Sequence, residues 1–211
     1  MKKLTLLLLA ALSGLTASAQ TEKGTHMLGG SFSLNHNKSE PANTPSAEAT
    51  NKQNAFSIGP SYTYFLANKL GLTANLGYSR SHSDQYATSG STETTNTGLF
   101  ASLSLNKYFL FEDKIGVRTG PFASYNTQKA KATSTYDYNG GDFDFKGYSA
   151  GLNLEFVYFP VKRIGLVASL GSLAYSRTEF KRSTGATKQT DLSLGFLNNT
   201  TSFSFYYVLG K

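Results

Sequence analysis

Apolar residues alternate with small uncharged residues along five long stretches of this 211-residue chain, and none of these stretches contains a charged side chain. The stretches cover residues 55–66, 70–79, 97–106, 164–176 and 202–209. Alternation with a period of two predicts β-strands. A strand of a water-soluble sheet usually carries charge on the face that meets water. Uncharged strands instead indicate that one face meets lipid while the other lines a crowded interior.

The two faces of the predicted strands differ in side-chain size. Within residues 70–79, three leucines, Ala74 and Tyr78 share one face, and the opposite face holds Gly, Thr, Asn and Ser. The apolar faces continue for about nine to eleven residues, the length that a tilted strand needs to cross a bilayer. Small polar side chains suit the narrow interior of an eight-stranded barrel. A soluble ligand-binding barrel would instead place Lys and Glu on its polar face.

An internal repeat organises the chain. Residues 65–72, 109–117 and 159–166 share a basic residue followed by Leu or Ile, Gly, and Leu or Val. Repeats at such a period indicate a repeated supersecondary unit, which here is strand, tight turn, strand. Segments rich in Ser, Thr, Asn, Gly and charge lie between these units and predict loops. These polar segments span residues 37–52, 83–96, 129–144 and 179–190.

Eight strands follow from this division. They are predicted at about residues 25–36, 53–66, 70–82, 97–111, 115–128, 145–160, 164–178 and 191–209. The fold class predicted is all-β, an eight-stranded antiparallel up-and-down transmembrane β-barrel with three short periplasmic turns and four long extracellular loops.

The N-terminal residues predict an export signal. Two lysines precede a mostly apolar run, Leu4–Leu15, and a small-residue cleavage site follows at Ala17–Ala19. The run is shorter than the roughly 20 residues that a membrane-spanning helix needs. We therefore expect a signal peptide over residues 1–19 and one barrel domain over residues 20–211. The chain contains no Cys, which excludes disulfides and a lipid-modified N-terminal cysteine.

The charge balance is basic, with a formal net charge of +7 that falls to +5 once Lys2 and Lys3 are removed. The remaining basic residues are spread over the predicted loops and turns and form no cluster interleaved with aromatic residues. This distribution argues against nucleic acid as a partner. It favours contact with anionic lipid head groups or polysaccharide.

Two charged residues interrupt the small polar faces. Arg118 and Glu155 fall on neighbouring predicted strands, and a buried charge needs a partner, so we expect them to form a charge pair in the lumen. Lys107 falls on the apolar side near a short turn. There its side chain could extend to the membrane interface, unless a bulge reverses the strand.

Aromatic residues recur near both ends of the predicted strands and predict two interfacial bands. Ordinary enrichment of aromatic residues in strands is the alternative explanation. Phe65 and Phe159 also lie beside the short turns and are assigned to the band there. The other residues expected at the interfaces are Tyr78, Tyr125, Tyr175, Phe109, Phe111, Tyr158 and Tyr207.

Two groups of residues could carry chemistry. His82-Ser83-Asp84 contains the residue types of an acyl hydrolase, but adjacent residues of a strand point to opposite faces and cannot form that site by themselves. Asp137, Asp142 and Asp144 offer oxygen ligands for Ca²⁺ around a Gly-Gly turn. Their spacing differs from that of the twelve-residue calcium loop, and no Glu closes it. We therefore expect no enzyme activity, no metal and no cofactor.

The export signal, the repeated hairpins and a closing aromatic strand together carry a family resemblance. That strand contains Phe203, Phe205, Tyr206 and Tyr207. The mature chain resembles the small outer-membrane-protein β-barrel domains of Gram-negative bacteria. The resemblance implies a location in the cell outer membrane, insertion by the outer-membrane assembly machinery, and outer-membrane lipid and lipopolysaccharide as neighbours.

The function expected is that of a non-enzymatic integral outer-membrane barrel with a structural or surface-interaction role. A wide pore is not expected, because eight strands close around packed side chains. The long loops are the expected contact surface, although no motif in them identifies a partner. Two alternatives stay open at this point: a soluble periplasmic β-barrel that binds a ligand, and a barrel enzyme that modifies lipid A.

Overall fold

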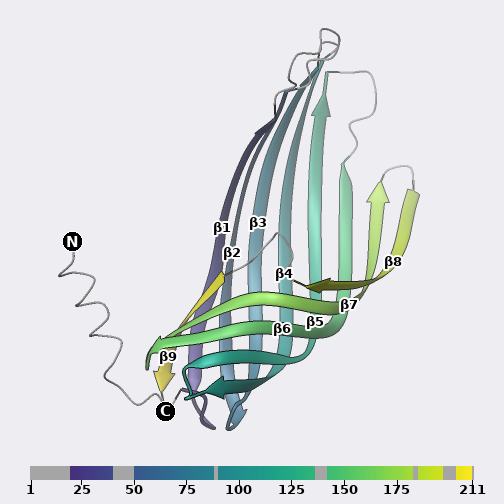
Figure 1. Ribbon diagram of the computed structural model, residues 1–211. Coiled ribbons are helices and arrows are strands. Elements are labelled where there is room, and N and C mark those ends of the chain that lie inside the picture. The colour runs from purple at the N-terminus through teal and green to yellow at the C-terminus, as the bar shows by residue number, and fades with distance from the viewer. Residues whose placement is uncertain are drawn as a thin grey trace, which may run out of the picture.

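The computed structural model describes residues 20–39, 50–87, 90–135, 142–182, 185–196 and 203–210. Nine antiparallel strands lie within these residues (Figure 1). They are β1 (His26–Ser39), β2 (Thr50–Ala67), β3 (Leu70–Ala87), β4 (Gly90–Phe111), β5 (Ile115–Ser134), β6 (Phe143–Val161), β7 (Ile164–Arg182), β8 (Gly185–Phe196) and β9 (Phe203–Gly210). Within the described residues, no helix is both long and apolar enough to cross a membrane.

Strand pairing forms a closed ring. Each strand from β1 to β7 pairs with its sequence neighbour, and β9 pairs with both β7 and β1. The pairs between β1 and β9 lie within His26–Gly30 of β1, so the ring closes at the end that carries the short turns. Because neighbouring strands are antiparallel and consecutive, the fold is the predicted up-and-down β-barrel of eight strands around the ring.

The last predicted strand, residues 191–209, is divided in the structure. β8 pairs with the half of β7 farther from the short turns, where Gly171 is opposite Phe196. β9 pairs with the half of β7 nearer the short turns, where Ala168 is opposite Phe203. The polar residues 198–201, Asn-Asn-Thr-Thr, interrupt the apolar alternation between the two strands. Both pieces therefore occupy the eighth position of the ring at different heights.

The strands continue into segments that the polar composition assigned to loops. β3 runs on to Ala87 and β4 begins at Gly90, so most of residues 83–96 is paired strand. β7 and β8 cover most of residues 179–190 in the same way. These segments are rich in Thr, whose branched side chain favours strands and pairs well across them. Cross-strand polar pairs thus extend the sheet beyond the part that has an apolar face.

Apolar side chains point outward from the barrel and small polar ones point inward. Leu76 is 63% exposed on the outer face, and Leu103 on the neighbouring strand is 51% exposed. The inward residues Thr73 and Ser104 are buried. The Thr63 and Thr73 hydroxyl oxygens lie 2.8 Å apart in a hydrogen bond across the lumen side of β2 and β3. This orientation is the one predicted from the alternation.

The lumen near the short turns is apolar, in contrast to the small polar filling that was expected throughout. Phe65 and Phe159, assigned above to the interfacial band, point inward and are 0% and 1% exposed. That assignment is wrong, because both fall on the inward phase of the pleat beside glycines that leave room for a ring. A Cβ on Gly165 would lie 2.8 Å from Phe159 Cε1. The buried lumen cluster comprises Met27, Phe65, Tyr108, Val157, Phe159, Val167, Tyr206 and Val208.

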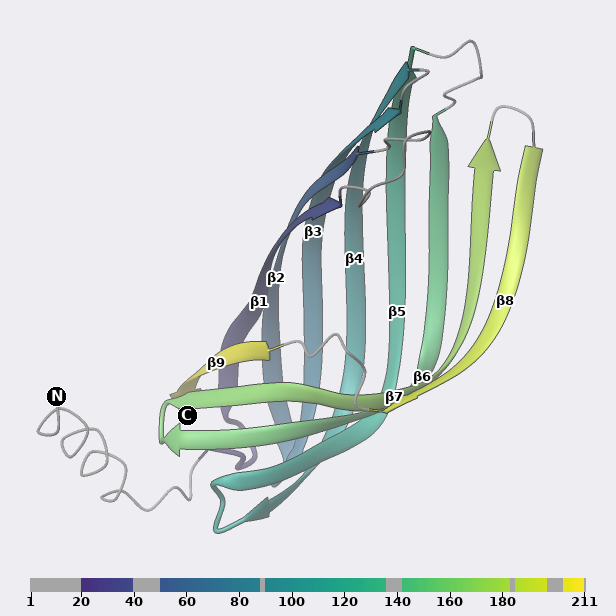
Figure 2. The ribbon, with the colours of Figure 1, turned by 45° about the horizontal axis from the view of Figure 1, so that its top comes forward.

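Strands β5, β6 and β7 change direction part-way along their length, so their lower parts run across the end of the barrel (Figure 2). Gly120 of β5 lies at an interruption in the pairing with β4, and a Cβ there would approach Leu105 O to 1.9 Å. A register shift between Leu154 and Glu155 marks the bend in β6. Glycine and bulges permit such bends because they remove a side chain or a ladder pair.

The three short turns occur where the repeat predicted them. Lys69, Glu112 and Asp113 adopt positive φ angles of 62°, 49° and 53° in two of these turns. The residues before β1 fold against the same end, where Lys69 N donates to Thr21 O at 2.7 Å. The predicted signal peptide, residues 1–19, lies outside the described residues.

Candidate functional site

The lumen is organised around one buried cation. Arg118 of β5 points inward and is 3% exposed. Its Nε donates to Glu155 Oε2 of β6 at 2.7 Å, and the two residues are direct cross-strand partners. The structure therefore brings together the two charges that the sequence assigned to a lumen pair. A charge-assisted bond at this distance is one of the stronger polar interactions available to a buried side chain.

Two tyrosines complete the coordination of the guanidinium. Arg118 Nη1 donates to Tyr108 OH at 2.8 Å and Nη2 donates to Tyr206 OH at 3.3 Å. The Arg118 Cζ atom also lies 5.6 Å and 5.4 Å from the centroids of these two rings, within the range of cation–π attraction. The arginine thus joins β4, β5, β6 and β9 across the lumen.

Sequence reasoning missed both tyrosines as lumen residues. The alternation along β4 indicates that Tyr108 points inward, because its neighbours Lys107 and Phe109 point outward. For Tyr206, the signal is a glycine opposite. Gly29 pairs with Tyr206, and a Cβ on Gly29 would lie 2.6 Å from Tyr206 Cδ1. The glycine leaves the space that the inward ring occupies.

A polar cavity of about 290 Å³ lies against the Arg118–Glu155 pair. Its walls are mostly serine and asparagine, with Phe100 and Phe122 among the apolar residues. Among the described residues, Ser61 Oγ and Asn153 Oδ1 line it without a protein hydrogen-bond partner. A polar cavity of this size has room for several water molecules, which would satisfy such groups.

The apolar lumen cluster lies on the other side of Arg118, toward the short turns. Arg118, Tyr108 and Tyr206 form one continuous layer with that cluster, which we call the lumen floor. We define the lumen floor as Met27, Phe65, Tyr108, Arg118, Val157, Phe159, Val167, Tyr206 and Val208. Each of these side chains is at most 5% exposed. The arrangement separates the polar cavity from the end of the barrel that carries the short turns.

The predicted interfacial aromatics lie on the outer face. Tyr175, Tyr207, Phe109 and Phe111 are exposed. Tyr78, Tyr125 and Tyr158 are half-buried on strands whose outward phase they share. Tyr125 packs on outward Tyr148 with ring centroids 4.9 Å apart. Their placement at the membrane boundaries stays a prediction.

Lys107 also lies on the outer face and is exposed. Its Nζ donates to Asn68 O of the adjacent short turn at 3.4 Å. Lys107 and outward Leu70 are cross-strand partners, so no reversal of the strand is involved. The side chain extends along the surface toward the turn, as expected of a lysine near a membrane interface.

The hydrolase-like residues do not assemble. His82 and Asp84 share the outer face of β3, where His82 Nε2 lies 3.0 Å from Asp84 Oδ1. Ser83 points to the opposite face and donates to Asn51 Oδ1 at 3.1 Å. The serine therefore lies across the sheet from the histidine that would have to activate it. Glu93 of β4, which sequence reasoning did not consider, is the cross-strand partner of Asp84.

The three aspartates that could ligate Ca²⁺ are not seen together. Asp137 lies outside the described residues. Asp144 is the cross-strand partner of both Lys129 and Lys181, so basic side chains flank it on either side. Asp142 and Asp144 line one surface hollow together with Lys129 and Lys181.

The sequence matches a profile described as "Outer membrane protein beta-barrel domain" over residues 18–174. This match covers about three quarters of the chain, from before β1 to the middle of β7. The chain belongs to this family. No curated protein sequence matches the chain.

Solved structures similar to this family member include three outer-membrane proteins. OprG from Pseudomonas aeruginosa is 12% identical, with a TM-score of 0.42, and the match covers 92% of this chain and 100% of OprG. Ail, the attachment invasion locus protein of Yersinia pestis, is 11% identical, with a TM-score of 0.41 and coverage of 89% and 99%. A major outer membrane protein from Thermus thermophilus is 13% identical, with a TM-score of 0.45 and coverage of 88% and 99%.

Membership of this family places the barrel in the outer membrane. The outward leucines accordingly face the hydrocarbon of that membrane. This location rules out the soluble periplasmic ligand-binding protein that the sequence had left open.

Proposed function

We propose that this outer-membrane barrel is a non-enzymatic protein with a closed lumen that serves envelope structure and surface contact. The observation that carries the proposal is the lumen floor, in which Arg118 bonds Glu155, Tyr108 and Tyr206 within an apolar layer. A solute crossing the barrel would have to separate this buried ion pair and displace packed rings. Both steps are costly in a low-dielectric interior.

The length of the strands supports the surface-contact part of the proposal. β4 has 22 residues, which at about 3.3 Å per residue gives an extended length of roughly 70 Å. A tilted strand needs only about 9–11 residues to cross the hydrocarbon core. The ends of β2, β3, β4 and β5 extend far from the short turns (Figure 1). On this proposal they project beyond the bilayer, where their sequences are polar. A polar sheet there offers outer-membrane lipid, lipopolysaccharide or an extracellular partner a rigid surface.

The non-enzymatic part rests on the geometry of His82 and Ser83. A serine nucleophile needs a base within hydrogen-bond reach. The two residues point to opposite faces of β3, and His82 bonds instead to Asp84 and to Thr95. This arrangement supports a role other than acyl transfer to or from lipid A.

Conductance in planar lipid bilayers tests the closed lumen. We expect no stable conductance steps from the folded protein. A Tyr108→Ala/Arg118→Ser/Tyr206→Ala variant, which removes the three polar side chains of the floor, should conduct. Heat-modifiable migration in gels verifies that both proteins are folded. Stable steps from the unaltered protein, comparable with those of a general porin, would contradict the proposal.

Mass spectrometry of lipid A tests the absence of enzyme activity. Lipid A from cells with and without the protein should show the same distribution of acyl chains. A reproducible change that disappears in a His82→Ala variant would establish the lipid-modifying alternative.

A further inference from the structure

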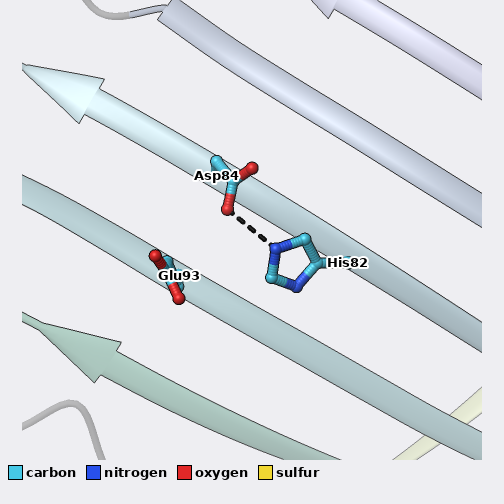
Figure 3. Close-up of side chains that lie close together, drawn as sticks. All are labelled: His82, Asp84 and Glu93. Carbon is cyan, nitrogen blue, oxygen red and sulfur yellow. Dashed lines mark ion pairs between the residues drawn. The ribbon is translucent and has the colours of Figure 1, made fainter.

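Three metal-ligating side chains meet on the outer face of β3 and β4, away from the lumen. His82 and Asp84 extend from β3, and Glu93 extends from β4 (Figure 3). One donor atom from each of the three lies within 4.8 Å of the other two. His82 and Asp84 lie four and six residues beyond Tyr78 along β3, in the part of the sheet that the proposed function places outside the bilayer. The group is therefore open to the cell exterior.

The strands fix the positions of these residues. Asp84 and Glu93 are direct cross-strand partners, and His82 is two residues from Asp84 on the same face. Side chains in such positions share one face because the pleat has a period of two. The three donors are consequently held by the backbone hydrogen bonds of a paired sheet, which orients them more firmly than a loop would.

The donor spacing is close to that of a zinc site. Two ligands at about 2.0–2.1 Å from a tetrahedral ion lie about 3.3 Å from each other. His82 Nε2 and Asp84 Oδ1 are already 3.0 Å apart. Glu93 has three rotatable side-chain bonds, so its carboxylate can close the remaining distance without movement of the backbone.

A hydrogen bond orients the imidazole. His82 Nδ1 lies 3.0 Å from Thr95 Oγ1, and Thr95 is the cross-strand partner of His82. In the tautomer in which Nδ1–H donates to the threonine, Nε2 has the lone pair that a metal ion needs, on the side of the carboxylates. Histidine ligands of metals usually have this kind of partner on the second ring nitrogen.

The charges around this group are of both signs. Like charges directly opposite each other across two strands destabilise the pair, and Asp84 faces Glu93 in this way. Three basic residues lie on the same outward rows, and one of them, Arg80, is two residues before His82 on β3. Lys52 is the partner of Asp84 on β2, and Lys131 is the partner of Thr95 on β5. The ion pair that Asp84 forms within the described residues is with His82.

We propose that His82, Asp84 and Glu93 form a Zn²⁺ site on the extracellular part of the barrel wall, with Thr95 orienting the histidine. One imidazole and two carboxylates match the ligand preference of zinc. Three protein ligands leave a fourth position for water or for a ligand from outside. Ca²⁺ prefers six to eight oxygen ligands, and a flat strand surface with a histidine does not provide them.

Titration calorimetry of the folded protein in detergent tests the site. The protein is purified without a polyhistidine tag, stripped of metal with a chelator and titrated with ZnSO₄ alone. We expect one Zn²⁺ per chain. His82→Ala and Glu93→Gln should each weaken binding by more than about 100-fold, and Thr95→Val should weaken it by about 10–100-fold, as loss of an orienting partner does.

His36→Ala is the matched control. His36 lies on the same outward row two strands away, about 10 Å from His82. It bonds Asn54 Oδ1 at 2.6 Å and has no carboxylate partner among the described residues. This variant should bind Zn²⁺ as the unaltered protein does. X-ray absorption of the loaded protein should report nitrogen and oxygen ligands with a single imidazole.

Three results would overturn the zinc site. The first is the absence of one-site binding by the unaltered protein. The second is equal Zn²⁺ affinity in the Glu93→Gln variant, once heat-modifiable migration shows that this variant is folded. The third is tighter binding of Ca²⁺ than of Zn²⁺ in the parallel titration.

Discussion

Replacement of Arg118 by Met tests whether the buried ion pair stabilises the barrel. The substitution keeps much of the apolar stem but removes the donors to Glu155, Tyr108 and Tyr206. Glu155 then keeps its charge with Asn153 Nδ2, at 3.3 Å, as its remaining donor within the described residues. Breaking a buried pair by removing one partner costs about 3–5 kcal/mol.

The position of Glu155 favours the lower end of that range. Its side chain is 19% exposed and lines the polar cavity, so water can solvate part of the stranded carboxylate. We expect a loss of about 3 kcal/mol in the free energy of unfolding, which is more than a hundredfold in the folded-to-unfolded ratio. Glu155→Gln alone should cost about 2 kcal/mol, the value of a hydrogen bond to a charged group.

The double variant separates the ion pair from simple packing. Arg118→Met/Glu155→Gln should lose about 2 kcal/mol, which is less than Arg118→Met alone and well below the sum of about 5 kcal/mol, because neither charge is left unpaired; the coupling is then about 3 kcal/mol. Urea unfolding in detergent micelles provides the measurement. Far-ultraviolet circular dichroism is the suitable signal because the chain has no Trp. Arg177→Met, at an exposed position on β7, is the control. An Arg118→Met variant as stable as that control would refute the reasoning.

Two further predictions test orientation and close packing. Leu76→Lys should lower the free energy of unfolding by about 2–4 kcal/mol, because Leu76 faces hydrocarbon. Tyr86→Lys, on the same face of β3 but beyond the bilayer, should change stability little. Equal losses for the two variants in urea unfolding from lipid vesicles would contradict the outward orientation. Gly29→Ala should lower the free energy of unfolding by about 1–3 kcal/mol, since the new Cβ would lie 2.3 Å from Phe205 O. Gly71→Ala should lower it less, since the atom nearest to the new Cβ is Thr63 Cγ2 at 3.0 Å. A larger loss in the folded fraction for the Gly71→Ala variant than for the Gly29→Ala variant would show that β9 adjusts freely.

The alternation of side chains along each strand was sufficient to determine the fold and its orientation. A period of two assigns every residue of a regular strand to one of two faces, and the absence of charge on the apolar face indicates lipid. The same parity placed Arg118 and Glu155 in the lumen on adjacent strands. The short turns were readable because their basic-Leu-Gly pattern recurs.

Only the tertiary structure decided which inward side chains lie at the same height. Register between distant strands, such as β4 and β9, depends on ring closure and on bulges that no local pattern records. For this reason Tyr108 and Tyr206 were missed as partners of Arg118. Phe65 and Phe159 were assigned to the wrong face although local alternation places both on the inward face. Glu93 was also missed as a neighbour of His82 and Asp84, because only the register between β3 and β4 places it opposite Asp84. Alternation along a strand is local, whereas height within a closed barrel is a property of the whole ring.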